Sequence, residues 1–224
     1  MAGMKFDDPL TGGDLPITGE QPVVRPGKIV CIGRNYREHA KELGNDVPAE
    51  PLFFLKPSTS LIFDGDAIVL PPQSERVEFE GEIGIVIGSR LTKASEEATV
   101  DAIRGVVAIN DVTARDLQKK DSQWTRAKGF DSFCPMGNVA TNFGDLSSLT
   151  VVTRVNGEEK QRGSASDMVF SIPVLLSYVS HVMTLEPGDI VATGTPSGVA
   201  PISEGDVIEV EIVGLSKVSN PVTA

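Results

Sequence analysis

Short runs of hydrophobic residues recur along the chain between glycine, proline and polar turn signals. Short runs rich in Val and Ile are typical of β-strands, whereas a helix needs a longer pattern with a period near 3.6 residues. Asn156 and Gly157 lie between two such runs, and Asn-Gly in that position is the strongest local signal for a β-hairpin. The pattern predicts strands over residues 28–32, 53–55, 83–87, 106–109, 190–192 and 207–212.

Helix signals are fewer. Ser95, followed by two glutamates, predicts the start of a helix that ends at Arg104 and Gly105. Thr113 and Asp116 have the spacing of a capping box, which predicts a second helix beginning at Thr113. Further helices are expected over 171–183, with a proline in the first turn, and over 36–43. These elements predict a strand-dominated α+β fold with a few short helices, because strands and helices do not alternate regularly.

The 224 residues carry 20 Lys and Arg against 31 Asp and Glu, a formal net charge of −11. This balance argues against binding to nucleic acid or to anionic membrane surfaces, since both need clustered basic residues. No apolar run approaches the ~20 residues that span a bilayer. We expect residues 1–22, rich in Gly and Pro, to form an extended leader, and residues 23–224 to form one domain. Two cysteines and no secretory signal predict a cytoplasmic protein.

The most informative stretch holds Glu78, Glu80 and Glu82, which in one strand would project from the same face. Because like charges stacked there repel, a divalent cation with hard oxygen ligands would stabilise them. Gly81 would let another part of the chain come close. Asp111 ends a second predicted strand and could join the site. The alternatives are a solvated acidic strand face, and a turn or cap role for Asp111.

His39 and Glu42 are three residues apart, so on a helix their side chains meet. A carboxylate beside an imidazole fixes its tautomer and makes it a stronger base for activating water. Lys128 and the loop 194–198, which includes Thr195, are further candidates, since such a loop can present N–H groups to a carboxylate. The alternatives are a solvated helix face and a surface lysine.

Together, several segments in one order resemble the fumarylacetoacetate hydrolase family, and within it the single-domain acylpyruvases and oxaloacetate decarboxylases. The matching segments are IVCIGRNYREHAKE, PLFFLKPSTSLI, EGEIGIVIG, INDVTARDLQ, WTRAKGFDSFCP, FSIPVLLSYVSHVMTLEPGDIVATGTPSGV and EGDVIEVEI. The resemblance implies a mixed β-sandwich roll of the type found in the C-terminal domain of that family. It also implies a homodimer.

The resemblance further implies Mg²⁺ or Mn²⁺ bound by Glu80, Glu82 and Asp111, with Glu78 outside the ligand set. His39 and Glu42 match a catalytic pair on a lid helix, and Lys128 matches a lysine that contacts the substrate oxyanion. The positions that match residues around the substrate are Arg34, Arg115, Gln118 and Thr195.

The function implied is metal-dependent C–C bond cleavage of small 2-oxo acids through a pyruvate enolate, by acylpyruvate hydrolysis, oxaloacetate decarboxylation or both. An alternative is an isomerase or decarboxylase of unsaturated 2-oxo diacids of the 2-hydroxyhepta-2,4-diene-1,7-dioate type, from aromatic catabolism. A non-enzymatic alternative is a β-rich Ca²⁺-binding or sugar-binding module. A single Trp and two Tyr argue against sugar binding, which commonly uses aromatic platforms.

Overall fold

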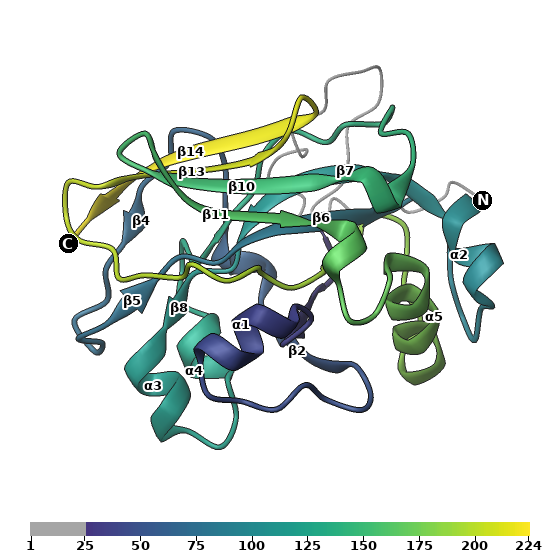
Figure 1. The fold of residues 1–224 in the computed structure, drawn as a ribbon, viewed down its shortest axis with the longest axis horizontal. Coiled ribbons are helices and arrows are strands. Elements are labelled where there is room, and N and C mark those ends of the chain that lie inside the picture. Colours follow the sequence, from purple (N-terminus) through teal and green to yellow (C-terminus); the bar gives the residue numbers. More distant parts are fainter. Residues whose placement is uncertain (1–25) are drawn as a thin grey trace, which may run out of the picture.

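Two five-stranded sheets packed face to face dominate the computed structural model, which describes residues 26–224 (Figure 1). The predicted leader, 1–22, lies outside the described residues. The first sheet has the order β2-β1-β12-β6-β7, in which only β1 and β12 run parallel. Its strands are β2 (Leu52–Lys56), β1 (Ile29–Gly33), β12 (Ile190–Ala192), β6 (Gly81–Ile87) and β7 (Ile103–Asn110).

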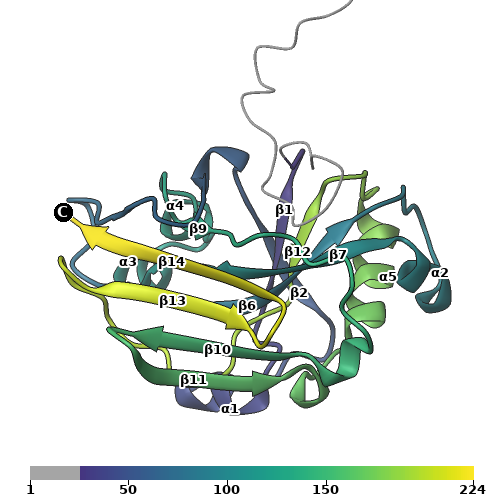
Figure 2. The ribbon, with the colours of Figure 1, turned by 90° about the horizontal axis from the view of Figure 1, so that it is seen from above.

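The second sheet has the order β11-β10-β13-β14-β4 and is seen from its outer side in Figure 2. Its strands are β11 (Glu158–Ser164), β10 (Thr150–Val155), β13 (Val207–Ile212), β14 (Ser216–Thr223) and β4 (Ile68–Val69). Two short pairs complete the strands described, namely β3 (Leu61–Ile62) with β9 (Cys134–Pro135) and β5 (Val77–Glu78) with β8 (Thr113–Ala114).

The helices are short and lie around the first sheet (Figure 1). They are α1 (Arg37–Glu42), α2 (Glu96–Asp101), α3 (Arg115–Lys120), α4 (Thr125–Lys128) and α5 (Ile172–Val182), with 3₁₀ turns at Ser58–Ser60, Leu146–Ser148 and Ala165–Asp167. No helix in residues 26–224 combines the length and apolar character needed to cross a membrane.

Strand β6 explains why the sequence shows an apolar run without alternation. Ile83 and Ile85 face the core between the sheets, together with Val210 of β13. Val86 faces the opposite side, where it packs in a second cluster with Val107 of β7. Both faces of β6 are therefore buried, which explains the apolar side chains on both faces after Glu82.

Local signals predicted several elements correctly. All six predicted strands are present. Asn156 and Gly157 have φ of +53° and +82°, the left-handed geometry of a tight hairpin turn, and they join β10 to β11. Helix α5 begins after Ser171 with Pro173 in its first turn, and α1 follows Tyr36 as predicted.

Two helix predictions were wrong in part. Helix α2 is capped by Ser95, whose hydroxyl accepts a hydrogen bond from Ala98 N, but it ends at Asp101 rather than Arg104. The residues after it join β7, because pairing with β6 satisfies their backbone groups. Thr113 caps no helix: it lies in β8, and its hydroxyl donates to the Asp111 carbonyl.

Candidate active site

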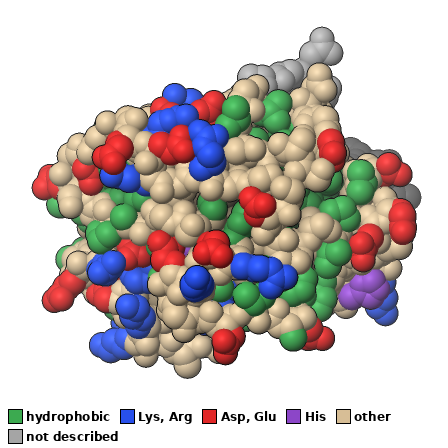
Figure 3. All heavy atoms as spheres, in the orientation of Figure 1, with side chains coloured by type: hydrophobic (Ala, Val, Ile, Leu, Met, Phe, Trp, Pro, Cys, Tyr) green, Lys and Arg blue, Asp and Glu red, His purple; other side chains and the backbone are tan. Residues whose placement is uncertain are grey.

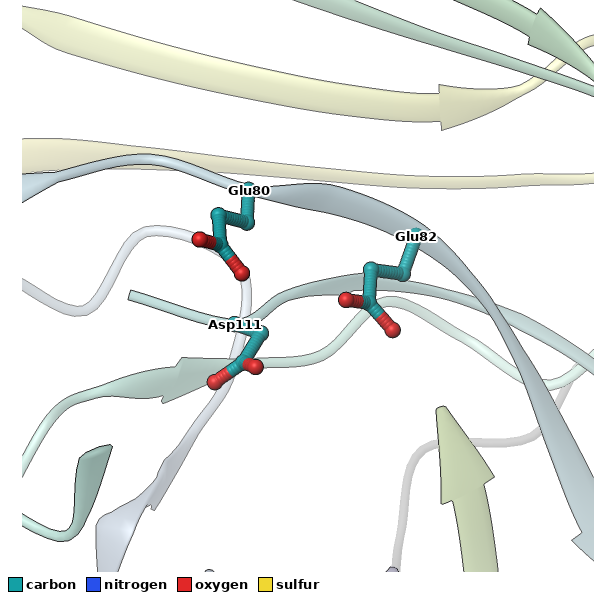
Figure 4. A group of neighbouring side chains, drawn as sticks. All are labelled: Glu80, Glu82 and Asp111. Atoms are coloured by element: carbon teal, nitrogen blue, oxygen red, sulfur yellow. The ribbon is translucent and has the colours of Figure 1, made fainter. Parts of the chain in front are cut away.

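The carboxylates of Glu80, Glu82 and Asp111 converge in the folded chain (Figure 4). One ligand oxygen from each lies within 4.8 Å of the others, and all three residues are buried. The antiparallel register pairs Gly81, at the start of β6, with Asn110, at the end of β7. Asp111 N also donates to the Glu80 carbonyl at 2.8 Å. The β6–β7 pairing therefore determines how these side chains meet.

The three glutamates do not share one continuous strand, so the strand-face prediction was wrong: Glu82 lies in β6, whereas Glu80 lies just before it. Strand β5 ends at Glu78 and β6 begins at Gly81. The Glu78 carboxylate instead accepts hydrogen bonds from Arg76 Nε and Arg115 Nε, both at 2.6 Å. It lies outside the converging oxygens, as the resemblance implied.

Gly81 permits the close approach that the sequence suggested. A Cβ atom added at Gly81 would lie 1.8 Å from Thr153 Oγ1, far inside van der Waals contact. The second sheet therefore packs directly against the start of β6, between Glu80 and Glu82.

Buried cations surround two of the three carboxylates. Lys128 Nζ lies 2.8 Å from Glu80 and 2.6 Å from Asp111, while Lys56 Nζ lies 2.6 Å from the other oxygen of Asp111. Burial alone would raise the pKa of Glu80, but Lys128 and Arg115 hold that pKa well below its usual range. Lys56 is completely buried and was missed by the sequence reasoning. Its position in the segment PLFFLKPSTSLI, a charge at the end of the otherwise apolar strand β2, was the available signal.

Glu82, unlike Glu80 and Asp111, has no positively charged partner among the described residues. Its carboxylate accepts a hydrogen bond from Gly194 N at 2.7 Å. Burial is the largest cause that raises the pKa of Glu82 well above its usual value, and repulsion from Asp111 and Glu80 adds to it. A buried carboxylate in such surroundings is stabilised by an added cation. Three carboxylates without sulfur or imidazole fit a hard divalent ion such as Mg²⁺ or Mn²⁺.

The predicted His39–Glu42 pair is formed on α1. His39 Nδ1 lies 3.2 Å from Glu42 Oε2, and the imidazole is buried while about a third of the Glu42 side chain is exposed. Gly198 N donates to the same carboxylate at 3.0 Å, which ties the helix to the loop 194–198. The pair is therefore held on both sides.

One cavity of about 450 Å³ brings the candidates together. All ten predicted site residues line it: Arg34, His39, Glu42, Glu80, Glu82, Asp111, Arg115, Gln118, Lys128 and Thr195. Arg115 donates to Gln118 at 2.6 Å, and Arg34 has a left-handed backbone with φ of +59°. Phe54 and Trp124, packed edge to face, add an apolar wall that the sequence did not indicate.

Comparison with known proteins now places the chain. The family model described as fumarylacetoacetate (FAA) hydrolase C-terminal matches residues 28–223. The chain therefore belongs to the fumarylacetoacetate hydrolase family, and the recognition made from its motifs is confirmed.

Named relatives are enzymes. The mitochondrial oxaloacetate decarboxylase of Dictyostelium discoideum is 43% identical, over 84% of this chain and 89% of the relative. The mitochondrial oxaloacetate tautomerase of Bos taurus is 42% identical, over 84% of this chain and 87% of the relative. The crystal structure of fumarylpyruvate hydrolase from Pseudomonas aeruginosa with Mn²⁺ and pyruvate is 29% identical, with a TM-score of 0.90, over 98% of this chain and 99% of that chain. The predicted fold class, a strand-dominated α+β fold of this family, is confirmed.

Proposed function

We propose that this protein is a divalent-metal-dependent enzyme that cleaves the C3–C4 bond of small 2-oxo acids. The reaction is acylpyruvate hydrolysis, oxaloacetate decarboxylation or both. One observation carries the proposal: the carboxylates of Glu80, Glu82 and Asp111 share a cavity with Lys128 and the His39–Glu42 pair. The names of the decarboxylase and hydrolase relatives support the same class of substrate.

A divalent ion held by Glu80, Glu82 and Asp111 would supply Lewis-acid polarisation of the substrate's carboxylate and 2-oxo oxygens. Mn²⁺ in the fumarylpyruvate hydrolase structure supports Mg²⁺ or Mn²⁺ as the cofactor.

Lys128 provides a fixed positive charge in the cavity wall. Breaking the C3–C4 bond leaves a pyruvate enolate, whose negative charge develops on oxygen during the reaction. Because burial leaves few water dipoles to compete, an ammonium group already in place stabilises that charge without reorganising. Lys128 thus serves hydrolysis and decarboxylation alike.

The His39–Glu42 pair is needed only where water is a reactant. Glu42 accepts a hydrogen bond from Nδ1 of His39, which leaves Nε2 to take a proton. In acylpyruvate hydrolysis, His39 removes a proton from the water that attacks the C4 carbonyl. In oxaloacetate decarboxylation the C4 group leaves as CO₂ and no water attacks.

A second candidate is proton transfer without C–C cleavage, as in isomerisation of unsaturated 2-oxo diacids. The name of the tautomerase relative favours it, since enol–keto exchange uses the same enolate. Substrate binding stays a prediction for four residues that line the cavity: Arg34, Arg115, Gln118 and Thr195. A homodimeric state and a cytoplasmic location also stay predictions. Light scattering tests whether the protein is a dimer.

The direct test is pyruvate release from acetylpyruvate, fumarylpyruvate and oxaloacetate, each measured with Mg²⁺, with Mn²⁺ and after chelation by EDTA. Ultraviolet absorbance followed in parallel reports tautomerisation of the enol form of oxaloacetate. Metal-dependent pyruvate release supports the proposal, while absorbance change without pyruvate supports the second candidate.

Thermal unfolding separates both from a passive binding module. Oxalate resembles the pyruvate enolate, so Mg²⁺ should raise the melting temperature and oxalate should raise it further. Stabilisation by Ca²⁺ alone, with no effect of oxalate, would favour the module and contradict both enzymatic proposals.

A further inference from the structure

The backbone of Gly81, between the two glutamates proposed as metal ligands, is held by side chains from distant parts of the chain. Gly81 N donates to Gln161 Oε1 at 3.0 Å. Gln161 Nε2 donates to Thr195 Oγ1 at 2.8 Å, and Thr195 Oγ1 donates to the Gly81 carbonyl at 2.9 Å. These three bonds form a closed ring that fixes both polar groups of the Gly81 residue.

Gln161 has no unused amide group. Its second Nε2 hydrogen goes to the Pro196 carbonyl at 2.7 Å, and the residue is 1% exposed. Gln161 lies in β11, the edge strand of the second sheet, whereas Gly81 begins β6 in the first. The buried amide of Gln161 therefore links the two sheets and the loop 194–198 at Gly81, the residue between Glu80 and Glu82.

The loop 194–198 in turn touches both halves of the candidate site. At one end Gly194 N donates to Glu82 at 2.7 Å, and at the other Gly198 N donates to Glu42. Gly198 has φ of +105°, and a Cβ there would lie 2.1 Å from the Lys160 carbonyl of β11. The loop is thus seated on the backbone next to Gln161, and its two end amides meet a proposed metal ligand and the partner of His39.

We propose that Gln161 is a positioning residue. By anchoring the loop 194–198 and the Gly81 peptide, it sets the place of Glu82 for metal binding and of Glu42 for activating His39. This inference rests on the proposed function, and it adds a residue that contacts neither metal nor substrate. Outer hydrogen-bond partners of this kind commonly change metal affinity 10–100-fold when removed.

The ring also changes the expected role of Thr195. Its only hydroxyl hydrogen is committed to the Gly81 carbonyl, so the hydroxyl cannot donate to a substrate while that bond stands. Thr195 therefore acts through its hydroxyl as a link between Gln161 and Gly81.

The test measures Mn²⁺ affinity of the metal-depleted full-length chain, by electron paramagnetic resonance of free Mn²⁺ during titration. Gln161→Met keeps the length of the side chain and removes the three hydrogen bonds that the Gln161 amide makes with Gly81, Thr195 and Pro196. We expect the Kd for Mn²⁺ to rise about 10-fold or more. At saturating Mn²⁺, acylpyruvate hydrolysis should fall by a larger factor than oxaloacetate decarboxylation, because only hydrolysis needs Glu42.

Asn220→Leu is the matched control. Asn220 is equally buried in β14 of the same sheet, and its amide donates to the carbonyls of Phe63 and Asp66, away from the cavity. This variant should lower the melting temperature and leave the Kd for Mn²⁺ unchanged. An equal loss of Mn²⁺ affinity in Asn220→Leu would show a general effect of destabilisation and overturn the proposal.

A second pair of variants decides the case if Gln161→Met does not fold. Thr195→Val breaks the ring and should weaken Mn²⁺ binding, whereas Thr195→Ser keeps the hydroxyl and should bind close to wild type. Wild-type affinity in Gln161→Met, or in Thr195→Val where the former does not fold, overturns the positioning role and leaves the proposed function standing. Failure of the wild-type chain to bind Mn²⁺ overturns the proposed function, and the positioning role with it.

Discussion

Charged residues form two contrasting groups in this protein. At the meeting of β6 and β7, Lys56 and Lys128 pair with carboxylates that are almost wholly removed from solvent. On the second sheet, Arg154 pairs with Glu209 and Glu211, and Lys217 also pairs with Glu209, and each of these side chains is partly exposed to water. Figure 3 shows basic and acidic side chains side by side over this second region.

Pairs of the same residue types differ in their effect on stability between the two regions, because their exposure to water differs. The partly exposed pairs on the second sheet are screened by water and contribute little free energy. In the buried group, removing one partner leaves an uncompensated charge at low dielectric, which is strongly unfavourable. Buried charge is retained there at a cost in stability, and at Glu82 it is left without a cation partner among residues 26–224. That contrast separates a site built for a ligand from an ordinary surface.

The largest effect is expected at Glu82. Glu82→Gln keeps the size of the side chain and an acceptor for Gly194 N, but removes a metal ligand, so pyruvate release should fall below detection. Because the negative charge is buried near Asp111 and Glu80, the metal-free melting temperature should stay the same or rise. Coupled pyruvate assays and thermal unfolding check both parts. Full metal-dependent turnover by Glu82→Gln would falsify the assignment of Glu82 as a metal ligand.

Two pairs with the same three-residue spacing sharpen the contrast further. His39→Ala should slow acylpyruvate hydrolysis by about 10²–10⁴-fold, the usual contribution of a general base, and slow oxaloacetate decarboxylation much less. Arg162 and Glu159 form the corresponding exposed pair, so Arg162→Ala should leave both rates unchanged. Steady-state rates on the two substrates provide the measurement. Equal losses in both reactions for His39→Ala would rule out a role in activating water.

A substitution at Lys56 tests how much a buried ion pair contributes to the free energy of unfolding. Lys56→Met leaves one oxygen of Asp111 without its buried ammonium partner, and should lower the free energy of unfolding by about 3–5 kcal/mol. Urea denaturation of the metal-depleted chain measures this loss. Added Mg²⁺ should restore part of it, since a cation beside Asp111 replaces the missing positive charge. A loss below about 1 kcal/mol would mean that Asp111 is not sensitive to its lysine.

The smallest effect is expected on the second sheet. Lys217→Met removes an exposed partner of Glu209 and should change the free energy of unfolding by about 0–1 kcal/mol. Activity should be unaffected. The same urea experiment, run beside Lys56→Met, gives the comparison directly, and a similar loss in both variants would remove the distinction between the two regions.

Much of the fold could be predicted because the signals are local. The Asn156-Gly157 turn, the apolar run of β6 and the Pro173 start of α5 each depend on neighbouring residues. The errors arose where a distant partner decided the outcome. Thr113 lies in β8 because it pairs with Glu78, and α2 stops early because the following residues pair with β6.

The candidate site shows the same division. Regular spacing and the family resemblance selected Glu80, Glu82, Asp111, His39 and Lys128, and the cavity contains them all. Lys56 and Gln161 were missed, because the groups that they bind lie 55 and 80 positions away along the chain.

The sequence by itself determined six of the strands, where the hairpin turns, and which residue types are available for metal and proton chemistry. These properties follow from backbone preference, hydrophobic period and side-chain chemistry, all of which act over a few residues. Only the tertiary structure decided which carboxylates are neutralised by lysine, which one is left without a cation partner, and which distant amide holds them. The reason is physical: burial and hydrogen-bond geometry exist only once the two sheets have packed, and they set the energy of each buried charge.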